Sequence, residues 1–449
     1  MGSTLSLPPF VSIIIPVHNK WDLTLACLKS LREHTLECPY EIIVVDNGST
    51  DATATQLAET GAQLFGGRFS FIRYDENRNF GPACNAGAKS ASAPIVFFLN
   101  NDTRVTAGWV VPLVNTLCGK PPLDSLVLPS DAQGDDPFGS FFALKDAYFP
   151  EFFDDRRLPA AAGPMLLYED DTVQHVGVSF TLNSFSHLYQ YFPATHPVVR
   201  RQRKVQALTG AAFMISKSLF LAYDGFFEGY CNGYEDLDLC LRMKREKRPF
   251  LCQPLSVVYH LESRTQGRMA SEHENALLFS ERCHDLVEFD LHRHAFADGF
   301  DVGVNDTFNF SIQLKSEDEQ KLDTMLDSLS TEALLEQMRF NPFWVGGPRR
   351  LAAYCSEAGQ FDDACIILGQ LAASCKRLDI YSDLLANALR AGQKNIAELA
   401  QEAIKDCMRK QRDYEFQKNF WKIVLRLGER DRDRFLREFA EYHLNKLKE

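Results

Sequence analysis

The sequence predicts an α/β domain followed by an all-α domain, in a chain of 449 residues. Between residues 11 and 102, short β-branched apolar runs alternate with segments of helical spacing, which is typical of a parallel sheet with right-handed crossovers. From residue 316 on, Leu, Ala, Glu, Lys and Arg prevail at helical spacing. We therefore expect an N-terminal tail, an α/β domain, a linker and a helical domain, at residues 1–10, 11–305, 306–330 and 331–449.

The elements of the first domain follow from local patterns. Strands are predicted at 11–17, 41–46, 69–74, 95–99 and 255–260, where apolar and β-branched residues run together. Helices are predicted after Asp22, which can cap the first of them, after Ser49 and Thr50, over 82–92 and over 235–247. Regular structure is also expected within 165–180 and 205–216, whereas residues 120–165, rich in Pro, Asp and Phe, predict an irregular excursion over the sheet.

Composition limits the partners and the compartment. The formal net charge of −12 argues against a nucleic-acid partner, which requires a basic face. The 12 cysteines show no paired Cys-x-x-Cys spacing, so they predict buried free thiols in a reducing cytoplasm rather than a zinc site. Neither a signal peptide nor an apolar run of membrane-spanning length is visible. The first six residues fit the loose myristoylation pattern, which leaves peripheral association with the inner face of the cell membrane open.

The strand at 95–99 carries the most informative feature. Its five apolar residues end in Asn100, Asn101 and Asp102. Ligands of open α/β sheets bind at the carboxyl ends of the strands, so Asp102 is placed to hold a hard cation beside a phosphate. An ordinary Asn-Asp turn closing a strand is the alternative.

Three further polar turns follow predicted strands or open a helix. Pro16, His18 and Asn19 follow the first strand, and Asp46 begins an Asp-Asn-Gly-Ser-Thr-Asp turn after the second. Residues 77–87, which include Gly81 and Asn85, contain small residues that let a helix N-terminus approach a diphosphate. Each turn alone has a plain structural explanation, but four of them at one sheet edge predict a ligand site. Neither a Walker loop nor a Gly-x-Gly-x-x-Gly fingerprint is present.

Two downstream motifs add titratable groups. Glu235 and Asp236 open a predicted helix, where acids are favoured by the helix dipole, and Asp236 is also a candidate general base. His260 ends a predicted strand, and it either has a structural role or joins Asp102 on a divalent ion such as Mn²⁺.

The C-terminal region contains a weak repeat. Gly359, Gly392 and Gly428 lie 33 and 36 residues apart, close to the period of paired-helix repeats. The pattern over 351–364 resembles a tetratricopeptide repeat, with each glycine at a turn between helices. An ordinary helical bundle is the alternative. Stacked helical pairs form concave surfaces, so we expect a protein partner or self-association through this region.

Taken in order, the motifs of the first domain resemble an inverting glycosyltransferase of family two, with the GT-A nucleotide-sugar fold. The resemblance covers about residues 10–305 and rests on residues 12–19, 44–51, 79–81, 85–87, 99–102, 208–215, 233–236 and 260. Residues 174–178 and 187–189 are also similar to the rhamnosyltransferase-like branch, which builds bacterial surface polysaccharides.

The resemblance implies a role for each matching residue. Contacts with the nucleotide of a UDP- or dTDP-linked sugar are implied for Pro16, His18, Asn19, Asp46, Gly81, Asn85, Asn101 and Asp102. Asp102 and His260 would hold Mn²⁺ or Mg²⁺, and residues 209–211 would border the sugar and the acceptor. Asp236 would be the base, supported by Glu235. Asn101 departs from the Asp-x-Asp-like motif, which has a carboxylate there.

The implied activity is metal-dependent, inverting transfer of a sugar to a hydroxyl of a glycan, a lipid-linked acceptor or a protein, in surface polysaccharide or glycoconjugate synthesis. A sugar-1-phosphate nucleotidyltransferase is a second enzymatic alternative, but residues 16–20 lack the Gly-rich loop that it needs. The non-enzymatic alternative is an inactive nucleotide- or glycan-binding scaffold that acts through its helical repeats.

Overall fold

The computed structural model describes residues 9–35, 38–118, 158–182, 184–261 and 268–448. Contacts between residues divide the chain into a first unit, residues 1–178 and 186–287, and a second unit, residues 179–185 and 288–449. Most of the predicted tail and of the irregular segment, at residues 1–8 and 119–157, lies outside the described residues. The predicted linker at 306–330 stays a prediction.

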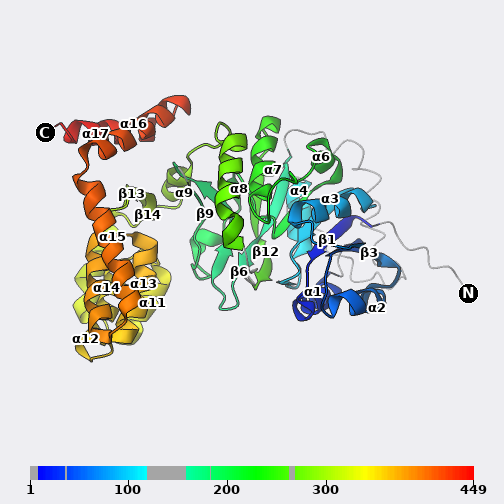
Figure 1. Ribbon diagram of the computed structural model, residues 1–449, viewed down its shortest axis with the longest axis horizontal. Helices are drawn as coiled ribbons and strands as arrows, with labels where there is room; N and C mark the ends of the chain where they lie inside the picture. Colours follow the sequence, from blue (N-terminus) through cyan, green and yellow to red (C-terminus); the bar gives the residue numbers. More distant parts are fainter. Residues whose placement is uncertain (1–8, 36–37, 119–157, 183, 262–267, 449) are drawn as a thin grey trace, which may run out of the picture. The chain divides into compact units, whose positions relative to one another are not determined.

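The first unit is built on one mixed sheet (Figure 1). Its main path runs β10-β12-β6-β11-β4-β1-β2-β3, with β5 paired to β12 and β7 paired to β6. Strands β1 to β4 are parallel to one another, as are β6 and β12, whereas β11 is antiparallel to both β4 and β6. Its strands are β1 Val11–Val17, β2 Tyr40–Asn47, β3 Phe69–Tyr74, β4 Ile95–Leu99, β5 Thr103–Val105, β6 Ala161–Leu167, β7 Val173–His175, β10 Arg203–Val205, β11 Ala212–Ser216 and β12 Phe250–His260.

Helices cover both faces of this sheet. Side chains of α1 and α2 share one apolar cluster with Ile13, Ile15 and other residues of β1. On the opposite face, α3 approaches β1 so closely that a Cβ on Gly87 would lie 2.4 Å from Ile14. In Figure 1, α1 and α2 accordingly lie on one side of the strands and α3 on the other. The helices of this unit are α1 Trp21–His34, α2 Thr53–Phe65, α3 Phe80–Ser90, α4 Val110–Leu117, α6 Lys217–Ala222, α7 Glu235–Met243 and α8 Arg268–Cys283.

The start of α1 differs from the prediction. Helix α1 begins at Trp21, so Asp22 lies inside the first turn and is not the cap. The Trp21 N–H instead donates to the carboxylate of Asp51, 3.0 Å away. Asp51, 30 positions further along the chain, thus takes the capping role predicted for Asp22, because the two turns meet at the sheet edge.

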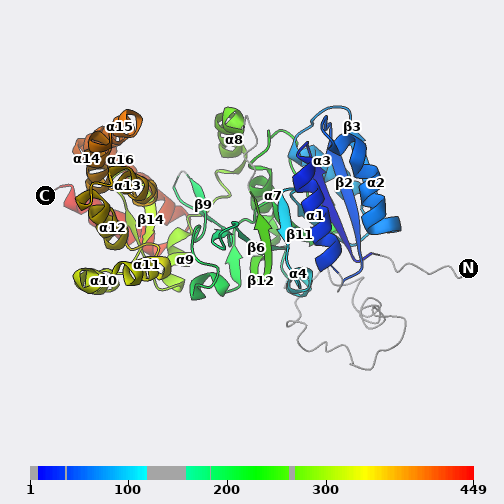
Figure 2. The ribbon, with the colours of Figure 1, turned by 90° about the horizontal axis from the view of Figure 1, so that it is seen from below.

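The second unit is mainly helical. After α9 and the β13-β14 hairpin, helices follow one another with short connections, and neighbours from α12 to α15 lie side by side (Figure 2). The elements are α9 Leu291–Ala297, β13 Asp301–Val304, β14 Phe310–Gln313, α10 Ser316–Met325, α11 Thr331–Phe340, α12 Gly346–Glu357, α13 Phe361–Cys375, α14 Leu378–Ala391, α15 Lys394–Arg412, α16 Tyr414–Arg430 and α17 Arg434–Lys446. The order of an α/β unit and a helical unit confirms the predicted fold class.

Two of the three glycines of the predicted repeat lie in turns between helices. Gly359 and Gly392 have φ values of +78° and +72° and lie in the turns after α12 and α14, as predicted. Gly428 does not, because it is a buried residue within α16. A Cβ there would lie 2.8 Å from the backbone nitrogen of Arg437, so this glycine allows α17 to approach α16. The tetratricopeptide resemblance stays a prediction.

All 12 cysteines are free thiols, and Cys27 is fully buried in the first unit. Burial raises the pKa of the Cys27 thiol to about 12, which makes it an inert core residue.

Among the described residues, no helix combines the length and apolar character needed to cross a membrane. The cytoplasmic location stays a prediction.

Candidate active site

The topology brings the predicted turns to one edge of the sheet. Because β1, β2 and β4 are parallel, their carboxyl ends meet at that edge. Strand β11 runs the other way, so its first residue, Ala212, pairs with Leu99 at the end of β4. Strand β12 is parallel to β6, which is itself antiparallel to β11, so His260 at the end of β12 reaches the same edge.

The turn after β1 is fastened to the turn after β2. Pro16 is buried and pairs with Val45, whereas His18 is exposed and its Nδ1 lies 2.9 Å from the carbonyl oxygen of Asn47. The Asn19 Oδ1 accepts hydrogen bonds from the N–H groups of Thr50 and Asp51, at 2.8 and 3.2 Å. This cross-bracing explains why Asn19 holds a left-handed conformation, with φ at +59°.

Asp46 shapes the turn that it begins. Its side chain is 2% exposed, and one carboxylate oxygen accepts the Ser49 N–H at 2.9 Å. The other oxygen pairs with Arg73, whose guanidinium also donates to the Ser49 carbonyl at 3.0 Å. The sequence pattern around Arg73 does not predict this role. A direct contact between Asp46 and a ribose stays a prediction.

The turn after β2 also meets the segment before α3. The Asn47 side chain donates to Asn77 and to the Asn79 carbonyl, at 2.9 and 3.0 Å, and accepts the Arg78 N–H at 2.8 Å. Gly48 has a φ of +73°, and a Cβ there would lie 2.6 Å from the backbone of residue 76. Only glycine fits this close approach between the two turns.

The N-terminus of α3 is tied to the loop that precedes α7. The first helical N–H, of Phe80, donates to Asn232 Oδ1 at 2.9 Å. Asn85 is 4% exposed, and its carboxamide both donates to and accepts from the backbone of Phe226, at 2.8 and 2.9 Å. Gly81 faces the same loop, with its Cβ position 3.4 Å from the Phe227 carbonyl oxygen. Asn85 therefore holds a loop directly, and its contact with a nucleotide stays a prediction.

Asp102 and His260 come together although they are far apart in the sequence. His260 Nε2 lies 3.2 Å from Asp102 Oδ1 and 3.3 Å from Asn100 Nδ2. The two side chains are 10% and 13% exposed. Asn101, between the two polar residues of the turn, donates to the Thr24 hydroxyl at 2.9 Å and so fixes the turn to α1.

Gln174 orients the imidazole of His260. Its Oε1 lies 2.7 Å from His260 Nδ1, and its Nε2 donates to the His260 carbonyl oxygen at 3.4 Å. A carbonyl oxygen can only accept, so the amide group must face it and Oε1 must face the ring. Nδ1 therefore carries the proton, and Nε2 is the atom directed at Asp102. Gln174 is 5% exposed.

The candidate base is fixed by backbone amides. The Gly210 N–H donates to Asp236 Oδ2 at 2.6 Å, and the Leu237 N–H donates to Oδ1 at 2.8 Å. Asp236 is partly exposed, whereas Glu235 is 6% exposed and accepts the Gly233 N–H at 2.7 Å. Glu235 thus shapes the glycine turn that leads into α7.

A continuous series of hydrogen bonds joins the base to the Asp102–His260 pair. Gly210 binds Asp236, and the next residue, Ala211, accepts the Asn100 N–H at 2.9 Å. The Asn100 side chain then reaches His260. Residues from four separate segments of the chain are therefore held in one network at the edge of the sheet.

A third acid of α7 could not be assigned a role from the sequence. Asp238 is fully buried, and Nε of Arg242 and Nε of Arg282 lie 2.5 and 2.6 Å from its two oxygens. Burial by itself raises the pKa of Asp238, but the hydrogen bonds and charges of the two guanidinium groups outweigh it and lower the pKa below the ordinary value. The Tyr230 hydroxyl also donates to Asp238, at 3.1 Å. This cluster fixes α7, the helix that carries Asp236, to α8.

The Asp102–His260 pair has the geometry of two neighbouring metal ligands. At metal–ligand distances of about 2.1 Å, adjacent ligands of an octahedral ion are about 3 Å apart, close to the 3.2 Å between Oδ1 and Nε2. Within the described ranges, no group of three or more His, Cys, Asp or Glu could hold a metal ion by itself. The pair alone would leave the other positions of such an ion to further ligands.

A known family model matches part of the first unit. The family model described as glycosyl transferase family 2 matches residues 12–177. Residues 12–177 therefore resemble a family 2 glycosyl transferase domain. The matched segment includes the turns after β1, β2 and β4 and Gln174, whereas Asp236 and His260 lie beyond it.

Several curated proteins are similar to parts of the chain. An uncharacterised protein of Sinorhizobium fredii, y4gI, is 25% identical over 65% of this chain and 28% of its own length. The O-antigen biosynthesis protein RfbC of Myxococcus xanthus is 28% identical over 57% of this chain and 17% of its own length. The glycosyltransferase AglE of Haloferax volcanii is 35% identical over 26% of this chain and 38% of its own length. The matches to this chain thus span well under half of the length of each of these relatives.

A solved structure with a weak overall likeness is GalNAc-T7 with UDP, GalNAc and Mn²⁺. It has a TM-score of 0.44 and 13% sequence identity, and the alignment covers 62% of this chain and 48% of that one.

Proposed function

We propose that this protein is an inverting glycosyltransferase that moves a sugar from a nucleoside diphosphate donor to a hydroxyl of a glycan or glycoconjugate. The observation that carries the proposal is the network at the sheet edge, in which Asp236 and the Asp102–His260 pair are held together by Gly210, Ala211 and Asn100. The family 2 domain supports the reaction class. RfbC, by its name, acts in O-antigen biosynthesis, which supports a surface glycan as the acceptor.

In the proposed reaction, Asp236 removes the proton of the acceptor hydroxyl. The acceptor oxygen attacks the anomeric carbon from the face opposite the nucleotide, the bond to the diphosphate breaks, and the configuration inverts. The Gly210 N–H holds the carboxylate of Asp236 in place, so little reorientation is needed. A divalent ion held by Asp102 and His260 would neutralise the charge of the departing diphosphate.

The donor would lie along the turns after β1 and β2. Among the predicted site residues of these turns, His18 is exposed and Asn19 is partly exposed, and both are held by backbone and side chains of residues 47–51. They are therefore the side chains that we assign to contact with the base and ribose. Asp46 supports this turn indirectly, because its carboxylate accepts the Ser49 N–H.

The test is a screen of nucleotide sugars against the purified full chain, with release of free nucleotide measured with Mn²⁺, with Mg²⁺ and with a chelator. We expect release with one or a few donors, stimulated by metal and lost in Asp102→Ala. If the protein binds nucleotide but releases none from any donor with any acceptor, the transferase proposal fails and the inactive scaffold alternative takes its place.

A further inference from the structure

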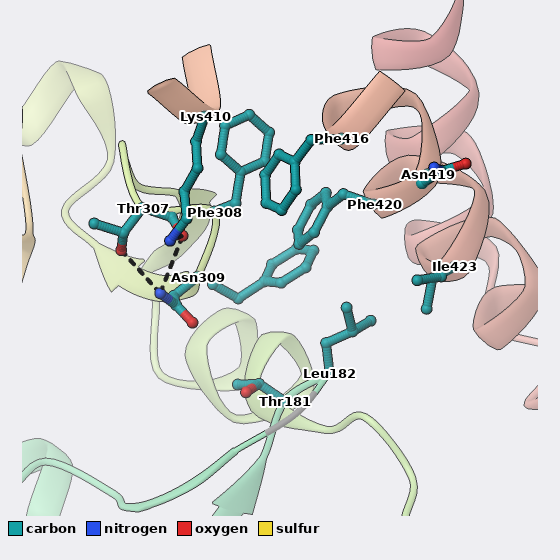
Figure 3. A pocket seen from close by; sticks show the side chains of 11 residues that line it. Thr181, Leu182, Thr307, Phe308, Asn309, Lys410, Phe416, Asn419, Phe420 and Ile423 are labelled. Atoms are coloured by element: carbon teal, nitrogen blue, oxygen red, sulfur yellow. Dashed lines mark hydrogen bonds between the residues drawn. The ribbon is translucent and has the colours of Figure 1, made fainter. Parts of the chain in front are cut away.

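The second unit contains a pocket outside the proposed active site. It has a volume of about 340 Å³ and lies between the loop before β14, helix α16 and residues 181–182. Figure 3 shows the rings of Phe308, Phe416 and Phe420 gathered on one side, with Asn309 and Lys410 beside them. The volume is near the lower end of the roughly 300–1,000 Å³ that small-molecule sites have.

The loop that forms one wall is built at an energetic cost. Phe308 has a φ of +59°, a conformation that is rare for a bulky residue and costs on the order of 1–3 kcal/mol. The buried side chain of Asn305 holds it there, because its Oδ1 accepts the N–H groups of Thr307 and Asn309 at 3.1 and 3.0 Å. Such strain persists only where several surrounding contacts hold the backbone in that conformation.

The same loop is anchored to two helices through Asp306. One carboxylate oxygen accepts the Leu378 N–H at the start of α14, at 2.6 Å, and the other accepts from Gln411 near the end of α15, at 2.8 Å. The loop is therefore held by its own residue Asn305 and by the two helices α14 and α15. As a result, Phe308 is presented to Phe416 and Phe420 with its ring nearly perpendicular to theirs, at centroid distances of 5.2 Å.

The lining combines flat rings with uncharged polar groups. Lys410 lies 2.7 Å from Asp406, a carboxylate that it shares with Arg409, so its ammonium charge is only partly neutralised. Asn309 donates from Nδ2 to the Thr307 hydroxyl at 2.8 Å. Within the part of the chain that the structure describes, its Oδ1 accepts no hydrogen bond and the Asn419 carboxamide makes none.

This combination matches the chemistry of a sugar ring. A pyranose has an apolar C–H face that packs on aromatic rings, and its hydroxyls both donate and accept, as carboxamides do. We propose that this pocket binds one neutral sugar residue, separately from the donor and acceptor positions of the sheet edge. That the sugar belongs to the acceptor glycan rests on the proposed function; the binding itself does not.

The test is equilibrium binding to the full chain, by saturation-transfer NMR and calorimetry. The probes are the methyl glycosides of glucose, galactose, rhamnose and N-acetylglucosamine. We expect at least one glycoside to bind, and Phe416→Ala and Phe416→Leu each to weaken it about tenfold or more. Trp421, whose ring lies 4.8 Å from that of Phe420, provides a fluorescence signal for the same titration.

The matched control is Phe340→Ala, which removes a 45% exposed ring elsewhere in the second unit and should leave the affinity unchanged. Binding that persists in Asp102→Ala and with saturating UDP places the sugar away from the sheet edge. The inference is overturned if no glycoside binds, if UDP displaces it, if Phe340→Ala weakens it equally, or if only an octyl and not a methyl glycoside binds. Sugar binding without any transfer activity would contradict the proposed function but not this inference.

Discussion

Gln174 Oε1 accepts a 2.7 Å hydrogen bond from His260 Nδ1, and this bond decides which nitrogen of His260 faces Asp102. A histidine that ligates a metal usually donates its other N–H to an oxygen acceptor, which fixes the tautomer and the ring orientation. Gln174 is thus a positioning residue, separated from His260 by 86 residues of sequence.

Replacement of Gln174 separates positioning from simple packing. Gln174→Leu should weaken Mn²⁺ affinity by roughly 10- to 100-fold, because the imidazole loses its orienting acceptor. Gln174→Glu keeps an oxygen at that position and should retain most of the affinity. Titration of Mn²⁺ by electron paramagnetic resonance measures both without any turnover. Equal losses in the two variants would show that Gln174 only fills space.

Asp236→Asn tests the base. Asparagine keeps an oxygen that can accept the Gly210 N–H, so the loop should stay in place. We expect transfer to fall by at least about 100-fold, as is typical when a general base is removed, while binding of the nucleotide changes little. The two are measured by nucleotide release and by calorimetry with UDP or dTDP. Full turnover by this variant would exclude Asp236 as the base.

Asp102→Ala and His260→Ala should each abolish the stimulation of activity by added metal. The physical reason is that each removes one of two ligand atoms that lie 3.2 Å apart. Activity is measured over a range of Mn²⁺ concentrations, with Glu59→Ala on α2 as the control for a carboxylate away from the site. A variant that keeps the wild-type metal response would show that the ion, if used, is held elsewhere.

The Asp238 cluster predicts a specific loss of stability. Arg282→Ala leaves a buried carboxylate with Arg242 as its main partner, so we expect a loss of about 2–3 kcal/mol in the free energy of unfolding, below the ~3–5 kcal/mol for a buried charge left with no partner. Urea denaturation measures it. Arg434→Ala, which removes an ion pair whose arginine is 82% exposed, should change stability by under about 1 kcal/mol.

The pH dependence of that stability follows from the pKa of Asp238. Its folded pKa is lowered, so its contribution is fully present above the unfolded value of about 3.9 and is lost as the pH falls through the lower folded value. Arg282→Ala should therefore flatten the acid limb of the stability curve below about pH 4. An unchanged acid limb would mean that other carboxylates dominate it.

Gly428→Ala tests the one repeat glycine that is not in a turn. A Cβ would lie 2.8 Å from the backbone nitrogen of Arg437, which cannot move without shifting α17. We expect a destabilisation of about 1–3 kcal/mol, as for overpacked cores. In contrast, Gly369→Ala in α13 has open space around the new methyl group and should be neutral or stabilising. Thermal melts of the two variants compare these effects.

Local patterns in the sequence were enough to predict the parallel strands and the turns that follow them. The turns after β1, β2 and β4 carry their own polar residues, so Asp46 and Asp102 could be found without a structure. Arg73 and Arg282 could not, because they act on residues 27 and 44 positions away and have no distinctive neighbours. Gln174 lies in the segment 174–178 that carries part of the family resemblance, but its contact with His260, 86 positions away, is not visible in the sequence. The wrong cap assignment at Asp22 has the same cause, since its replacement comes from Asp51.

Asn85 and Asn232 couple two functions that a protein engineer would wish to vary separately. Both side chains belong to the contact between α3 and the loop that leads to Asp236. Under the proposed function, a change in α3 that shifts this contact would therefore also shift Asp236, the proposed base. We therefore expect a substitution at this contact to alter donor choice and acceptor linkage together.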